Sequence, residues 1–259
     1  MPNGSLTVVG TGIAFGVHMT LQARIAIERA DDVFYLLAEE TGETWLQGLN
    51  PSSHSLRGHY AVGRPRRETY DRMVEQILAA VRSERHVCAA FYGHPGVFAN
   101  PAHDAIKRAR EEGFTAVMLP AISAEDCLFA DLGVDPGESG CQSYEATDFL
   151  LRRRRFDTTV PLILWQVAFI GIRTAPVAVN EQGFGVLVDY LLEHYDESHP
   201  AVVYEASPYP VGAASIEEFT LGSVRTAGLD GMSTLFLPAA RERAEDSEMR
   251  SRLGVELDP

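Results

Sequence analysis

The stretch SLTVVGTGI at residues 5–13 predicts a buried strand that runs directly into a tight turn. Residues 5–10 are small, partly β-branched and end in glycine, which is typical of a strand covered on both faces. The turn holds Gly10 and Gly12, and a turn in this place commonly presents its backbone to a ligand. We therefore expect a parallel sheet whose carboxyl edge carries the functional site.

Helices and strands alternate through the first half of the chain. Helices are expected over residues 20–30, 66–83 and 100–113, and strands over 33–37, 87–92 and 115–119. Thr20 and Asn100 are the expected caps, and apolar residues follow a 3.6-residue period in the helix over 66–83. Residues 42–63 are expected to be mainly loop, with at most a short helix near Trp45. The alternation favours parallel βαβ units.

The second half is less regular. Strands are expected over 141–146, 160–167, 201–206 and 233–237, and helices from Ser123, over 184–195 and in the charged tail. Ser123 with an acidic residue three places on predicts a capping box. We expect an N-terminal α/β lobe over 1–119, a C-terminal α/β lobe over 120–240 and a polar tail over 241–259, with a cleft between the lobes.

The composition is that of an acidic globular protein. The chain has 259 residues, 46% of them hydrophobic and 22% charged, and its formal net charge is −14. Such a surface repels duplex nucleic acid and anionic membranes, so neither is an expected partner. Three cysteines without a C-x-x-C pair support neither a disulfide framework nor a zinc site, and no metal is expected. Since no leader or long apolar run is seen, a cytoplasmic protein is expected.

Two glycine-bearing turns permit more than one interpretation. Gly10-Thr11-Gly12 followed by Gly16 misses the spacing of a dinucleotide loop, and a tight turn explains its glycines equally well. The stretch FYGHPGVF at 91–98 places two glycines and a proline after a strand, which suits close approach of a flat ligand. Its histidine, His94, has no second ligand at a spacing typical of metal sites.

Tyr60, Arg66 and Tyr70 form another candidate cluster. Arg66 and Tyr70 are four residues apart on one expected helix, so their side chains share a face. Tyr70 also lies on the apolar stripe of that helix, which explains it equally well as a core residue. A phenol beside a guanidinium suits the removal of a proton from a weak acid and neutralisation of the anion.

The sequence resembles the tetrapyrrole methylase superfamily, whose class III fold joins two α/β lobes and binds S-adenosylmethionine in the cleft between them. Residues 6–13, 19–21 and 30–35 carry this resemblance. One branch, the borosin peptide α-N-methyltransferases, is similar over about residues 5–240. The stretches concerned are FYGHPGVF at 91–98, MLP at 118–120, SAEDC at 123–127, ADL at 130–132, DP at 135–136, GC at 140–141, YEA at 144–146, DFL at 148–150 and QV at 166–167. Tetrapyrrole enzymes typically carry Gly-Asp-Pro where this chain has Gly93-His94-Pro95, which favours the borosin branch.

The resemblance implies S-adenosylmethionine as cofactor, with S-adenosylhomocysteine as its product. The residues implied to line the cofactor pocket are Tyr92, His94, Val97, Phe98, Ser123, Ala124 and Gln166, with Ala206, Met232, Ser233 and Thr234 around the adenosine. Tyr60, Arg66 and Tyr70 match the catalytic group of the branch. The tyrosine expected three residues before Tyr60 is Arg57 here, which adds positive charge instead.

The reaction implied by the branch is α-N-methylation of backbone amides in a ribosomally synthesised peptide. An amide nitrogen is a poor nucleophile because its lone pair is delocalised into the carbonyl. Tyr60 or Tyr70 is expected to take the N–H proton as a phenolate, because a neighbouring guanidinium lowers the pKa of a phenol from about 10. Arg66 is expected to hold the amide oxygen and stabilise its developing charge.

The substrate peptide is expected to be a separate molecule. Fused borosins carry their core peptide on a long C-terminal extension, whereas about twenty residues follow Pro238 here. We therefore expect a split system with the precursor acting in trans, and an interlocked homodimer as in the branch. A precorrin-type C-methyltransferase is the alternative enzyme, since the loop over 56–66 is basic. A non-catalytic scaffold is a third possibility, against which the intact Tyr60, Arg66 and Tyr70 argue.

Overall fold

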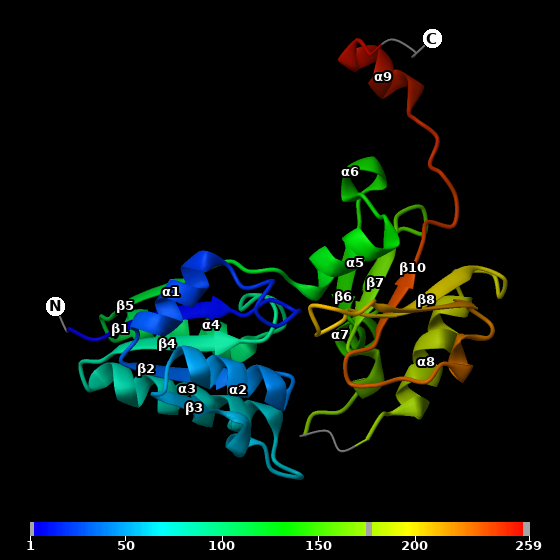
Figure 1. The fold of residues 1–259 in the computed structure, drawn as a ribbon. Coiled ribbons are helices and arrows are strands. Elements are labelled where there is room, and N and C mark those ends of the chain that lie inside the picture. Colours follow the sequence, from blue (N-terminus) through cyan, green and yellow to red (C-terminus); the bar gives the residue numbers. More distant parts are fainter. Residues whose placement is uncertain (1–2, 175–177, 256–259) are drawn as a thin grey trace. The chain divides into compact units, whose positions relative to one another are not determined.

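The computed structural model describes residues 3–174 and 178–255, which form two units, each built around a five-stranded sheet (Figure 1). The first unit takes in the described residues of Met1–Val134, Gly171–Asn180 and Tyr204–Ser215. The second takes in those of Asp135–Ile170, Glu181–Val203 and Ile216–Pro259. The predicted α/β class is confirmed, while the predicted lobe boundaries at 119 and 240 stay predictions.

The sheet of the first unit is entirely parallel. Its strands lie in the order β3 (Ser53–Ser55), β2 (Asp32–Leu36), β4 (His86–Phe91), β1 (Ser5–Gly10) and β5 (Thr115–Met118). The strand predicted from residues 5–10 is therefore an interior strand, between β4 and β5. Because all five strands run the same way, their carboxyl ends meet at one edge.

Helices cover both faces of this sheet. Side chains of one strand alternate between the faces, so Val8 and Ala89 belong to one core and Val9 and Ala90 to the other. The helices α3 (Arg66–Arg82) and α4 (Asn100–Glu111) supply the first core, and α1 (Leu21–Arg29) and α2 (Glu40–Leu49) supply the second. Burial on both faces explains why the strands are so apolar.

Two details of the first half differ from expectation. The stretch expected to be mainly loop contains the ten-residue helix α2 and the short strand β3. Helix α2 forms because Leu46 is fully buried and Gly42 packs against the ring of Phe15, contacts that local propensity does not reveal. Asn100 lies inside α4 rather than capping it, since Ala99 occupies the cap position.

The second unit has a mixed sheet. Its strands lie in the order β6 (Gln142–Glu145), β7 (Leu162–Trp165), β10 (Thr234–Leu237), β8 (Pro200–Glu205) and β9 (Ser215–Thr220). Strand β7 is parallel to β6 and antiparallel to β10. Helices α7 (Ala146–Leu151) and α8 (Glu181–Leu192) pack on it, while α6 (Pro136–Ser139) is a single turn. Strand β9 was not predicted, because its residues are mostly exposed and lack alternation.

The charged tail contains the predicted short helix. It is α9 (Ser247–Leu253), which begins after Asp246, whose side chain accepts hydrogen bonds from the backbone N–H groups of Glu248 and Met249. Residues 256–259 of the predicted tail lie outside the described residues. Within the described part of the chain, no helix has the length and apolar character needed to cross a membrane.

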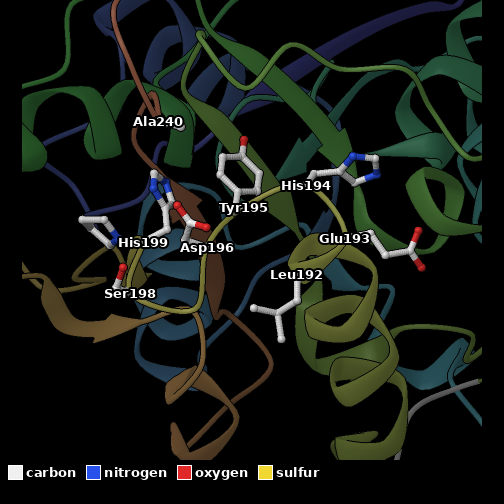
Figure 2. Close-up of a pocket in the computed structure, with 9 residues that line it drawn as sticks. Leu192, Glu193, His194, Tyr195, Asp196, Ser198, His199 and Ala240 are labelled. Atoms are coloured by element: carbon white, nitrogen blue, oxygen red, sulfur yellow. The ribbon is translucent and has the colours of Figure 1, made fainter.

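A hollow of about 450 Å³ lies at the end of α8 in the second unit (Figure 2). The rings of Tyr195 and His199 in its wall have centroids 4.6 Å apart. His199 is satisfied, because its Nε2 lies 3.0 Å from the carbonyl oxygen of Pro238. Tyr195 is 6% exposed, and its hydroxyl has no hydrogen-bond partner among the described residues. None of the predicted site residues lines this hollow.

Replacing Tyr195 with Phe should stabilise the protein. A buried hydroxyl without a partner costs free energy, so its removal is expected to raise the free energy of unfolding by about 1 kcal/mol at neutral pH. Urea unfolding followed by circular dichroism measures this, and a loss of stability in Tyr195→Phe would show that the hydroxyl is satisfied in solution.

The same variant should change the response to alkali. Burial, aided by the negative charge of Asp157, raises the pKa of Tyr195 to about 12. A pKa raised by folding contributes stability that is present below the ordinary value of about 10 and is lost as the pH rises through the folded value. The decline in stability between pH 10 and 12 should therefore be shallower in Tyr195→Phe than in the natural protein.

Candidate active site

The three predicted catalytic residues lie together in the first unit. Tyr60 directly follows the 3-10 helix η1 (Arg57–His59), and Arg66 and Tyr70 lie one turn apart at the start of α3. The pKa of Tyr60 responds to Tyr70 and to the positive charges of Arg66 and Arg57, so these four side chains lie close together. The start of α3 is fixed in place because the backbone N–H of Arg66 donates to the carbonyl of Arg173 over 2.9 Å.

The expected lowering of the phenol pKa is wrong for Tyr60. Burial and the neighbouring Tyr70 raise the pKa of Tyr60 to about 12, and the guanidinium charges of Arg66 and Arg57 offset this only in part. Tyr60 therefore keeps its proton at neutral pH and is not itself the phenolate.

Glycines bring the backbone together at the carboxyl edge of the parallel sheet. A methyl group on Gly10 would lie 2.1 Å from the carbonyl oxygen of Gly93 and 2.7 Å from Cδ of Pro95. Gly12 and Gly93 exchange two backbone hydrogen bonds, of 3.2 and 3.0 Å, and both have a φ near +70°. These contacts hold the turn after β1 against the turn after β4, at the edge where ligands of parallel sheets commonly bind.

The turn after β4 carries four of the residues implied to bind cofactor. His94 accepts a hydrogen bond at Nδ1 from the backbone N–H of Gly96 over 2.9 Å, which leaves Nε2 to carry the proton. Burial raises the pKa of Tyr92 above its ordinary range, with the neighbouring Cys127 and the Glu39 carboxylate adding to the effect. The side chains of Val97 and Phe98 are 38% and 47% exposed and so are accessible to a ligand.

Ser123 caps helix α5 (Ala124–Leu132), as predicted. Its hydroxyl accepts from the backbone N–H of Asp126 over 3.2 Å, and the Asp126 carboxylate accepts from the backbone N–H of Ser123 over 2.7 Å. Ser123 is buried and Ala124 half-buried at the first turn of the helix. The capping box thus fixes two implied cofactor residues just beyond β5.

Ala206 lines a pocket of about 510 Å³ within the first unit. The other walls come from the turn after β1, from α5 and from the stretch over 206–214. Of the residues implied to bind cofactor, Ala206 alone lines this pocket, although Ile122 in its wall adjoins Ser123.

The remaining implied residues lie in the second unit, in two turns that contact each other. Gln166 is half-buried with a φ of 60°, at the start of the 3-10 helix η2 (Val167–Phe169). A methyl group on Gly231 would lie 3.1 Å from the ring of Phe169, so the turn before β10 packs on η2. Ser233 and Thr234 are buried there, whereas Met232 is 46% exposed.

Some polar residues of the 510 Å³ pocket were not predicted. They include His18, Cys127 and Asp131, and the Asp131 carboxylate accepts a hydrogen bond from the hydroxyl of Tyr204 over 2.7 Å. Cys127 and Asp131 are four residues apart on α5, a spacing that could have placed them on one face. His18 reaches Cys127 only through the fold, at 4.0 Å between Nδ1 and Sγ, and no local pattern indicates it.

Among residues 3–174 and 178–255, no group of three or more His, Cys, Asp or Glu side chains is arranged to hold a metal ion.

The chain matches the family model of the Tetrapyrrole (Corrin/Porphyrin) Methylases over residues 5–221, and it therefore belongs to that family. Solved structures show the same fold. Uroporphyrin-III-C-methyltransferase from Thermus thermophilus is similar with a TM-score of 0.66 at 18% identity, covering 99% of this chain and 98% of that one. The methyltransferase CobJ is similar with a TM-score of 0.62 at 18% identity, covering 94% and 97%.

Fungal proteins are more similar in sequence. The methyltransferase and gymnopeptides precursor of Gymnopus fusipes is 42% identical over 96% of this chain and 61% of its own length. The methyltransferase and omphalotin A precursor of Omphalotus olearius is 40% identical, with the same coverage. A type I borosin cyclic peptide precursor of Coprinopsis marcescibilis is 41% identical over 96% of this chain and 66% of its length. The chain thus spans about three fifths of the length of the first two relatives, and the resemblance to borosins is confirmed.

Replacing Gly10 with Ala should destabilise the protein. The added methyl group would collide with the backbone of Gly93, so we expect a loss of about 2–3 kcal/mol in the free energy of unfolding. Gly48→Ala is the matched control, because its methyl group meets nothing within 4 Å in helix α2 and should stabilise by up to about 1 kcal/mol. Equal stability of the two variants in urea unfolding would contradict the close approach at Gly10.

Proposed function

We propose that the protein is an S-adenosylmethionine-dependent methyltransferase that methylates backbone amide nitrogens of a ribosomally synthesised precursor peptide. The observation that carries the proposal is the placement of Tyr60, Tyr70 and Arg66 close enough together to act on one another. It occurs in a chain about 40% identical to proteins named as both methyltransferases and precursors of cyclic peptides.

The reaction needs a group that removes a proton from an amide. The amide nitrogen becomes nucleophilic only when its N–H proton leaves or its imidate form is stabilised, because its lone pair is delocalised. We assign proton removal to the Tyr70 oxygen, since Tyr60 holds its own proton. In this proposal Tyr60 donates a hydrogen bond to that oxygen and so steadies the negative charge that Tyr70 carries during the transfer.

Arg66 is assigned to the oxygen of the same amide. As the N–H proton leaves, negative charge develops on the carbonyl oxygen, and a fixed guanidinium stabilises it. Arg66 and Tyr70 share one face of α3, so the two can act on the oxygen and the nitrogen of a single peptide group. The amide proton would pass to Tyr70 as a phenolate, and the nitrogen would take the methyl group whose bond to the cofactor sulfur breaks, with S-adenosylhomocysteine as the leaving group.

The residues at the carboxyl edge of the first sheet fit a cofactor that approaches backbone closely. A methyl group at Gly96 would lie 3.1 Å from Cε1 of His94, so a side chain at this position would be crowded. A ligand can therefore approach the backbone of this edge only at residues that have no side chain. Tyr92, His94 and Ser123 of the first unit would hold the cofactor, while the roles of Gln166 and Ser233 stay predictions from the resemblance. When bound, S-adenosylmethionine supplies an electrophilic methyl group on a positively charged sulfur.

The peptide is proposed to be supplied as a separate molecule, and the active form to be a homodimer, following the resemblance to borosins. Size-exclusion chromatography with light scattering tests the dimer. The cytoplasmic location stays a prediction from the sequence.

Removing the Tyr70 hydroxyl should abolish most of the activity. Tyr70→Phe keeps the ring in the core and is expected to lower the methylation rate at least about 100-fold, a usual loss for a general base. Arg66→Gln should lower it by a similar factor. Arg67→Gln is the control, because it removes an exposed guanidinium one position along α3 and should keep the activity.

The assay incubates the protein with S-adenosylmethionine and a synthetic precursor peptide rich in Val, Ile and Gly, and locates methyl groups by tandem mass spectrometry. Full activity of both Tyr70→Phe and Arg66→Gln would discard the assigned roles. Methylation of uroporphyrinogen in place of the peptide would identify a tetrapyrrole C-methyltransferase. Cofactor binding without turnover of either substrate would identify a scaffold.

A further inference from the structure

Arg57 makes more contacts than an exposed arginine on a loop usually does. Its Nε lies 2.9 Å from Oε1 of Glu43, and its Nη2 donates to the carbonyl of Leu37 over 2.8 Å and more weakly to that of Ala38 over 3.3 Å. Glu43 belongs to the first turn of α2, and the two carbonyls lie in the connection between β2 and α2. One guanidinium therefore joins η1 to three points of a neighbouring segment.

Arg57 adds to other attachments of the polypeptide around Tyr60. His59 lies with its Nε2 2.5 Å from Oε1 of Gln76 on α3, and the Arg64 guanidinium donates to the His59 carbonyl. Arg57 ties the same segment to the connection between β2 and α2.

Leu56 anchors one end of this segment, since it is fully buried and its backbone N–H donates to the carbonyl of Tyr35 over 2.8 Å. Between Tyr60 and α3, Ala61 and Arg64 are half-buried, whereas Val62 is 82% exposed. Tyr60 itself is 36% exposed.

We propose that Arg57 is a positioning residue for Tyr60, which clamps η1 onto the connection between β2 and α2 and holds a positive charge beside the Tyr60 hydroxyl. The effect on the methylation rate rests on the proposed function, whereas the clamp and its charge do not.

The positive charge of Arg57 and the burial of Tyr60 have opposite effects on the pKa of Tyr60. The groups that face the Tyr60 hydroxyl are Tyr70 and Arg66 from α3 and Arg57 from η1, and Glu43 is the counter-ion of Arg57. The positive charge of Arg57 lowers the pKa of Tyr60 against the rise caused by burial and by Tyr70. A phenol with a lower pKa is a stronger hydrogen-bond donor, so Arg57 strengthens the hydrogen bond that Tyr60 is proposed to donate to Tyr70.

The planar shape of the guanidinium explains why arginine suits this place. Its Nε and Nη2 donate in fixed directions, one to the Glu43 carboxylate and the other to a carbonyl of the β2–α2 connection. A lysine has a single ammonium group and keeps the charge without this geometry. Arg57→Lys therefore keeps the positive charge but removes the directed pair of hydrogen bonds, so it tests the two effects separately.

The test uses Arg57→Gln, Arg57→Lys and Glu43→Gln in the full-length protein. Arg72→Gln is the matched control, because Arg72 also pairs with a glutamate at 2.9 Å, its side chain is 53% exposed against 48% for Arg57, and it lies on α3. Circular dichroism confirms that each variant is folded. The first measurement is the ionised fraction of Tyr60 at pH 11, observed by NMR of ¹³C-labelled tyrosine and assigned with Tyr60→Phe.

Arg57→Gln is expected to lower that ionised fraction about threefold, because the nearby positive charge is lost. Arg57→Lys should restore part of it, and Arg72→Gln should leave it unchanged. In the peptide assay, Arg57→Gln should slow methylation about threefold to tenfold and move the basic limb of the pH–rate profile upward. Glu43→Gln should slow methylation less, because the charge of Arg57 stays.

An unchanged Tyr60 ionisation in folded Arg57→Gln would overturn the proposal. Full recovery of both readouts in Arg57→Lys would overturn the clamp, because charge alone would then suffice. If Arg57→Gln fails to fold, Arg57→Lys and Glu43→Gln test the proposal instead. The proposal is then contradicted if both variants have the same Tyr60 ionisation and the same methylation rate as the natural protein. A protein that methylates no peptide contradicts the proposed function, whereas the NMR measurement still tests Arg57.

Discussion

Gly10 lies so close to the turn after β4 that no side chain fits between them. A methyl group there would also lie 2.6 Å from Cβ of Ala121, beyond β5, so three strand ends converge on one glycine. The convergence places the His94 turn and the Ser123 cap at the same edge of the sheet. A parallel sheet brings its carboxyl ends together in any case, but only backbone without side chains lets the turns touch. The geometry of the candidate cofactor site in the first unit depends on this approach.

The Tyr60 and Tyr70 pair shows how burial and charge compete at one hydroxyl. Two guanidiniums act on Tyr60, yet burial and the neighbouring phenol outweigh them, and its pKa rises. That result keeps the proton on Tyr60 at neutral pH and leaves Tyr70 as the proposed base. It follows from desolvation of the Tyr60 hydroxyl, which is not visible from residue types alone.

Much of the first unit could be predicted from local pattern. The strand over residues 5–10, the helix after Pro65 and the Ser123 capping box each have a short-range cause, and the structure has all three. Helix α2 was expected near Trp45 but not its full length, and strand β3 was not expected, because contacts such as that of Gly42 with Phe15 come from elsewhere in the chain. Strand β9 was not predicted because its exposed residues show no alternation of polar and apolar side chains.

The candidate site was also predicted only where its residues are close in sequence, and not where they meet through the fold. Arg66 and Tyr70 are four residues apart on one helix, so their shared face follows from spacing, whereas the approach of Tyr60 requires the loop to be placed. The reversal of its pKa depends on burial in the finished fold. The contacts of Arg57 with Glu43 and Leu37 likewise join segments with no common pattern.

The central claim is that Tyr70 and Arg66 act on one backbone amide of a bound peptide. A crystal structure with S-adenosylhomocysteine and a precursor peptide measures this directly. We expect an amide nitrogen of the peptide within about 3.2 Å of the Tyr70 hydroxyl, the reach of a general base, and its carbonyl oxygen beside the Arg66 guanidinium. A peptide bound elsewhere, with both side chains turned away from its backbone, would contradict the account.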